Sequence, residues 1–147
     1  METDGRAGRR LRLRCPAVLG ELRVVRQRVQ RWARGNGLPD GVLVDLQLAV
    51  GEAVSNGIEH AYLPGGQGRG VATGVQAGVE VELELSTSGG EPVVAARVTD
   101  QGRWRPVPAD PGYRGRGLAL IRQLSRDMQV LRTAEGTQVT FAIPVAA

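Results

Sequence analysis

Apolar residues recur along the first third of the chain with two different periods. Residues 10–14 alternate, with Leu11 and Leu13 on one side, and this alternation predicts a short strand. Between residues 18 and 34 the apolar positions recur at spacings of four and three, which predicts a helix of about five turns with one apolar stripe. The Gly-Asn-Gly run at 35–37 is a typical helix end.

The rest of the chain predicts one more long helix, four strands and a shorter helix. Asp40 is a candidate N-cap for the long helix, which is expected to run from about residue 41 to 62. Strands are expected at 79–85, 93–99, 128–133 and 137–145, a turn at 86–92, and the shorter helix at 117–125. Residues 101–114 hold three Pro and two Gly, and an irregular segment is expected there.

This order of elements predicts an α+β fold. It suits a two-layer sandwich in which a mixed, mostly antiparallel sheet carries its helices on one face. A chain of 147 residues suits one domain. We expect residues 1–9 to form a flexible tail and residues 10–147 to form the domain.

Composition and charge narrow the function classes. All nineteen basic residues are Arg, so a Walker-type phosphate loop, which needs a Lys, is excluded. No apolar run is long enough to span a membrane, and the Arg-rich N-terminus lacks a signal core. A single cysteine, Cys15, cannot form an internal disulfide. These features favour a cytoplasmic protein with no membrane association.

Three polar residues of the second helix are candidates for chemistry. Glu52, Asn56 and His60 are spaced four apart and so project from nearly the same face. An Asn oxygen is a hard ligand that suits Mg²⁺, and a Glu one turn away can accept a proton from a hydroxyl. On spacing alone, an ordinary polar helix face explains the same residues.

Three later segments add candidate ligands. Asp100 ends a strand, where its carboxylate can accept a hydrogen bond from an exocyclic amine, and Gly102 would let a flat ring approach the backbone. The Gly-rich segment 112–117 opens a helix, whose free N–H groups and dipole favour phosphate. Gly136 and Thr137 open the last strand.

Taken in this order, the segments resemble the Bergerat-type ATP site of the histidine-kinase-like (GHKL) ATPase superfamily, in its anti-sigma-factor serine/threonine kinase branch. Residues 52–62 resemble the asparagine box, 100–102 the first glycine box, 115–118 the second glycine box, and 136–137 the final Gly-Thr element. The resemblance extends from Leu11 to Pro144 and implies the Bergerat ATPase fold.

The resemblance implies a role for each matching residue. Glu52 would be the catalytic general base, and Asn56 would coordinate the Mg²⁺ that bridges the ATP phosphates. Asp100 would bind the adenine amine, with Gly102 beside the base. Thr137 would support the adenine end through Asp100 or a water.

The second glycine box would contact the phosphates. Gly115, Arg116 and Gly117 would lie along them in a lid, while His60 belongs to the asparagine box. One departure from the family pattern is Trp104, which stands where the first glycine box usually has a second Gly.

The function implied is that of an ATP-dependent serine/threonine protein kinase. Its partners would be a STAS-type anti-anti-sigma protein, which it phosphorylates, and a sigma factor, which it sequesters; relatives suggest a homodimer. The only histidine is His60, which argues against self-phosphorylation on His. One alternative is a nucleotide-dependent binding module without turnover, or the ATPase domain of a larger signalling protein. The least favoured is a nucleic-acid binder that uses the N-terminal Arg cluster, because no stacking aromatics are interleaved with the arginines.

Overall fold

The computed structural model describes residues 8–16, 19–61, 78–100, 112–133 and 136–145. Within them a short 3-10 helix, η1 (Leu19–Glu21), precedes the first α-helix. The helices are α1 (Leu22–Gly35), α2 (Asp40–Ala61) and α4 (Gly112–Leu124), and the strands are β1 (Arg10–Pro16), β2 (Gly78–Ser88), β3 (Glu91–Asp100), β4 (Arg126–Thr133) and β5 (Gly136–Pro144).

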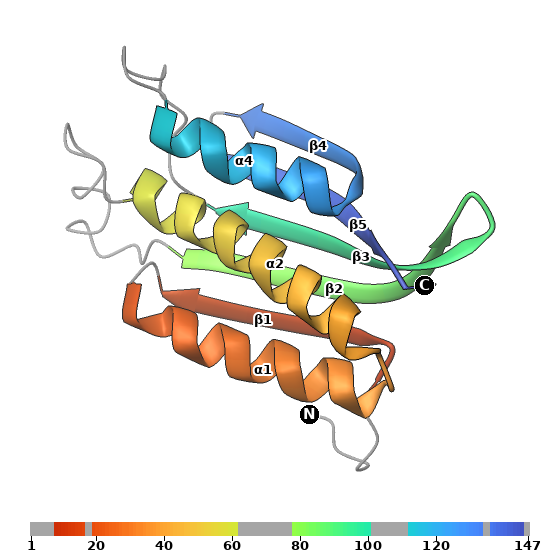
Figure 1. Cartoon of the computed structure of the whole chain (residues 1–147). Helices are drawn as coiled ribbons and strands as arrows, with labels where there is room; N and C mark the ends of the chain where they lie inside the picture. The colour runs from red at the N-terminus through yellow and green to blue at the C-terminus, as the bar shows by residue number, and fades with distance from the viewer. Residues whose placement is uncertain (1–7, 17–18, 62–77, 101–111, 134–135, 146–147) are drawn as a thin grey trace.

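The five strands form one sheet in the order β1-β2-β3-β5-β4, and every neighbouring pair is antiparallel. All three α-helices lie on the same face of this sheet (Figure 1). α1 packs over β1, α2 over β2 and β3, and α4 over β4 and β5. The predicted α+β sandwich with helices on one face is therefore confirmed.

Two element boundaries differ from the prediction. The turn expected over residues 86–92 is confined to Gly89 and Gly90, because the backbones of 86–88 and 91–93 continue the β2–β3 ladder. Both glycines have positive φ, 61° and 84°, as the tight turns of β-hairpins require. Helix α4 begins at Gly112, whereas the sequence predicted a start at Gly117, so residues 112–114 are helical and not irregular.

The core lies between the sheet and the helices, and α2 is its central element. Four α-helical turns of α2 contribute fully buried apolar side chains: Leu46, Val50, Val54 and Ile58. They belong to the same cluster as the inward-facing side chains of the strands, including Val81, Leu83, Val98 and Phe141. The predicted apolar stripe of α1 is also buried, at Val25, Val29 and Trp32. Among the helices of the described ranges, none is long and apolar enough to cross a membrane.

The beginning of the described chain is attached to α1 by hydrogen bonds. The carbonyl of Gly8 accepts one from Trp32 Nε1, at 2.9 Å, and one from Asn36 Nδ2, at 3.1 Å. Trp32 is buried, so this bond gives its indole N–H a partner that a buried donor needs. The predicted boundary between a tail and the domain at residue 9 stays a prediction.

Cys15 is buried at the edge of the core. Burial, and next the negative charge of Glu21, raise the pKa of its thiol above the usual value. The reactive form of a cysteine is the thiolate, so the thiol is held in its unreactive form. Cys15 is thus a small packing residue of β1.

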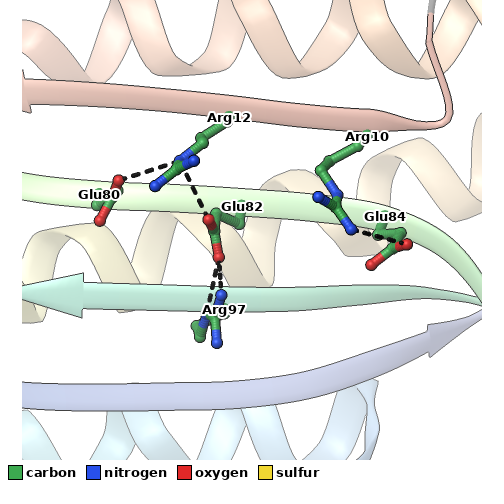
Figure 2. A network of polar contacts seen from close by, with 6 residues as sticks. All are labelled: Arg10, Arg12, Glu80, Glu82, Glu84 and Arg97. Carbon is green, nitrogen blue, oxygen red and sulfur yellow. Dashed lines mark hydrogen bonds and ion pairs between the residues drawn. The ribbon is translucent and has the colours of Figure 1, made fainter.

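The outer face of the sheet carries a ladder of opposite charges (Figure 2). Arg12 lies between Glu80, at 3.3 Å, and Glu82, at 3.2 Å, and Arg10 pairs with Glu84 at 3.3 Å. Arg97 of β3 approaches Glu82 from the other side. These groups are largely exposed, so each pair adds little stability, but together they neutralise this face.

The two leucines of α2 provide a matched test of the core. Leu46 is fully buried, whereas Leu48 is 46% exposed. Leu46→Ala should lower the free energy of unfolding by about 2–5 kcal/mol, because it leaves a cavity in the core. Leu48→Ala should change it by less than about 0.5 kcal/mol. Urea denaturation of both variants measures the difference, and equal losses would contradict the assigned packing of α2.

Candidate functional site

Glu52 and Asn56 lie one turn apart on the side of α2 that faces α4. Both side chains are partly exposed, in contrast to the buried apolar residues of the same helix. α2 and α4 pack directly against one another (Figure 1). The shared face that the sequence predicts for these two residues is therefore turned toward a neighbouring helix, not toward open solvent.

Gly117 of α4 is the residue that meets this polar pair. A Cβ added to Gly117 would lie 2.8 Å from Glu52 Oε1 and 3.5 and 3.6 Å from the two amide atoms of Asn56. Gly117 is buried, and its missing side chain leaves room for both polar groups. Parts of the predicted asparagine and second glycine boxes, far apart in sequence, thus come together.

Asp100 and Thr137 lie side by side at the end of the sheet nearest this pair. They are register partners in the β3–β5 ladder, and both are buried, at 6% and 3% exposure. The hydroxyl oxygen of Thr137 has no hydrogen-bond partner among the residues that the structure describes. A buried polar atom without a partner costs about 1–3 kcal/mol, so this hydroxyl is suited to bind a ligand or a water.

Gly57 joins the two halves of the site, and the sequence analysis did not single it out. Its added Cβ would lie 3.1 Å from both Asp100 Cβ and Val79 Cγ2. The absence of a side chain lets α2 approach the end of the sheet at Asp100, one residue after Asn56 along the helix. A signal was present: a glycine inside a helix costs about 1 kcal/mol relative to Ala, so it usually has a packing reason.

The other predicted site residues are only partly described. His60 lies in the last turn of α2, and Gly115 and Arg116 lie in the first turns of α4, where only the backbone is described. Gly102 falls outside the described residues, as does Trp104.

The side-chain oxygens of the site fit a metal ion that is coordinated mainly by the phosphates of a substrate. In the described ranges no group of three or more His, Cys, Asp or Glu side chains could hold a metal ion. Mg²⁺ usually keeps several waters and binds through one or two protein oxygens together with substrate phosphates. Asn56 can supply one such oxygen, and the buried Thr137 hydroxyl, which has no partner among the described residues, can bind a second part of the same ligand.

The fold and this arrangement define an ATPase-type domain in which one face of a sheet is covered by helices. A family model described as "Histidine kinase-like ATPase domain" matches residues 15–143. The chain belongs to that family, which confirms the superfamily predicted from the four motifs.

Two solved structures share the fold. One is the crystal structure of the RsbU and RsbW domains of Rv1364c from Mycobacterium tuberculosis, with 24% identity over 94% of this chain and a TM-score of 0.68. The other is the histidine kinase domain of the blue-light activated histidine kinase from Erythrobacter litoralis EL346, with 23% identity over 88% of this chain and a TM-score of 0.51. The chain spans 33% of the first protein chain and 61% of the second.

The close approach at Gly57 can be tested against a second glycine of α2. A Cβ added to Gly51 would meet nothing within 4 Å, so Gly51→Ala should stabilise the protein by up to about 1 kcal/mol through helix propensity. Gly57→Ala gains the same propensity but crowds Asp100 and Val79. Its free energy of unfolding should be about 1–3 kcal/mol below that of Gly51→Ala. Equal free energies of unfolding for the two variants in urea would show that α2 does not closely contact the sheet at Gly57.

Proposed function

We propose that this chain binds ATP with Mg²⁺ and transfers the γ-phosphate to a Ser or Thr of a protein partner. The observation that carries the proposal is the convergence of Glu52 and Asn56 on Gly117, beside the buried pair of Asp100 and Thr137. Membership of the histidine kinase-like ATPase family supports ATP binding. The likeness in fold to a chain that contains an RsbW domain supports the anti-sigma-factor kinase branch.

The nucleotide would lie between the two halves of the site. Asn56 would hold Mg²⁺ through its side-chain oxygen, and the ion would stabilise the negative charge of the phosphates. Gly115 and Gly117 would let the backbone of α4 lie along the phosphates, and Arg116 would provide a positive charge.

The adenine end is recognised by the sheet. The Asp100 carboxylate would accept a hydrogen bond from the exocyclic amine of the base, and the sequence resemblance assigns Gly102 a place beside the ring. The Thr137 hydroxyl bonds a water at the base or the base itself, which gives its buried oxygen a partner.

Glu52 acts as the general base. Its carboxylate accepts the proton of the attacking hydroxyl while Asn56, one turn along the helix, holds the metal. In phosphoryl transfer most of the rate comes from positioning and from stabilisation of charge, so this base supplies only part of it.

The proposed partners follow from the branch. A STAS-type anti-anti-sigma protein is the phosphate acceptor, a sigma factor is the competing ligand, and the protein acts in the cytoplasm as a homodimer. The second candidate is a nucleotide-dependent binding module without turnover, or the ATPase domain of a larger signalling protein. The likeness in fold to a chain that carries both an RsbU and an RsbW domain favours it.

The proposed nucleotide binding can be tested by substitution of Asn56 and of Asp100. Asn56→Ala removes the oxygen for the metal and should weaken Mg-ATP far more than metal-free ADP. Asp100→Ala should abolish the preference for ATP over GTP, because a site that accepts a proton from the 6-amino group of adenine discriminates strongly against guanine, which carries an oxygen at that position. Calorimetry with ATP, ADP and GTP, with and without Mg²⁺, measures both effects. Equal binding of ATP and GTP by the unmutated protein would refute the role of Asp100.

The proposed general base can be tested by substitution of two glutamates of α2, Glu52 and Glu59. Glu52→Gln should retain ATP binding while phosphate transfer to a STAS-domain protein falls roughly 10²–10⁴-fold, the usual contribution of a general base. Glu59→Gln, on the same helix, is the matched control and should transfer at nearly the normal rate. Single-turnover transfer at saturating ATP gives the two rates, and the reverse pattern would assign the base to Glu59. Nucleotide binding with no transfer to any STAS protein would favour the second candidate.

A further inference from the structure

Two sets of described arginines differ in their surroundings. On the outer face of the sheet, Arg10, Arg12 and Arg97 each have a carboxylate partner (Figure 2). The five arginines of α1 are exposed, and none forms an ion pair with any residue in the described ranges: Arg23, Arg26, Arg28, Arg31 and Arg34. The positive charge of α1 is therefore available to an external partner.

An apolar ridge lies on the neighbouring helix. Val44 and Leu48 of α2 are 56% and 46% exposed, although both are large apolar side chains. They are spaced four residues apart, and Glu52 follows after four more, so successive side chains lie one above the other with a rotation of about 40° at each step. Leu48 is about 6 Å from Glu52 along the helix axis.

The basic and apolar features are adjacent. α1 and α2 lie side by side on the sheet (Figure 1), and Gln47 Nε2 donates a hydrogen bond to the carbonyl of Arg26 at 3.0 Å. Gln47 directly precedes Leu48, so Arg26 lies at the level of the apolar ridge. Arg23, one turn earlier on α1, is on the same side of that helix as Arg26.

We propose that these four residues, Arg23, Arg26, Val44 and Leu48, form a docking surface for the protein whose hydroxyl is phosphorylated. We refer to them as the α1–α2 surface. This inference rests on the proposed kinase function and specifies its partner: a protein patch with an apolar centre bordered by carboxylates. With the patch on this surface, the acceptor hydroxyl is one to two helical turns away, at Glu52.

The chemistry of the surface favours a protein over a nucleic acid. Exposed Val and Leu gain by contact with apolar side chains and gain nothing from phosphates. Single-stranded nucleic acids are usually held by stacking on exposed aromatic rings. The described aromatic side chains, Trp32 and Phe141, are both buried.

The test separates docking from chemistry. Each STAS-domain protein encoded in the same genome is purified, and its direct binding and its phosphorylation are measured with the unmutated protein. The double variant Val44→Ala/Leu48→Ala should raise the KM for the acceptor about tenfold and leave kcat and ATP binding unchanged, because the contact is made equally in the ground and transition states.

The two arginines of the α1–α2 surface are tested by the rate of association and by its dependence on salt. Arg23→Glu/Arg26→Glu should slow association about tenfold or more at low salt and reduce the dependence of association on ionic strength. Leu131→Ala, on the remote edge strand β4 and also 56% exposed, is the apolar control, and Arg122→Glu on α4 is the basic control. Both controls should leave the KM unchanged.

The outcomes are distinguishable. Normal phosphorylation with an unchanged KM in both double variants overturns the docking surface and leaves the kinase function in place. Binding that depends on Leu48 and Arg26 without phosphorylation supports the surface and overturns the kinase function. No binding by any STAS protein, together with binding of a DNA duplex of about 20 base pairs that is lost in Arg23→Glu/Arg26→Glu, overturns both.

Discussion

The close contact between α2 and the end of the sheet is the constraint on which the site depends. At Gly57 the helix has no side chain, and an added Cβ would be only 3.1 Å from Asp100 and Val79. The buried residues upstream on the same helix, such as Leu46, Val50 and Val54, anchor α2 to the core. Because the core fixes the height and rotation of this helix, it also fixes the positions of Asn56 and Glu52.

A second glycine completes this geometry from the opposite side. Gly117 brings α4 against the polar pair of α2, while Asp100 and Thr137 meet through the register of β3 and β5. The two helices therefore leave room for polar groups where close packing would otherwise place apolar side chains. The buried hydroxyl of Thr137, without a partner in the described residues, is a cost that a bound nucleotide or water would offset.

Much of the fold could be predicted from hydrophobic periodicity, since each long helix and strand has a clear one. The start of α4 at Gly112 could not, because its glycines oppose helix propensity and packing on α2 overrides them. The shared face of Glu52 and Asn56 follows from a spacing of four. The adjacency of Asp100 and Thr137 depends on a strand register between distant segments, and the role of Gly57 depends on how closely α2 approaches the sheet.

The arginines of the outer sheet face form ion pairs, whereas those of α1 form none with the described residues. Of these two sets, only the arginines of α1 are therefore suited to recognise a partner. On the sheet, Arg10, Arg12 and Arg97 lie beside Glu80, Glu82 and Glu84, so these six charges cancel locally and attract little from solution. On α1, basic side chains that have no ion-pair partner among the described residues create a field that reaches about 8 Å at physiological salt. A partner drawn by that field would meet α1 and α2 on the helical layer, the same layer that carries Glu52. In the proposed function, long-range attraction and phosphate transfer would therefore take place on one side of the molecule.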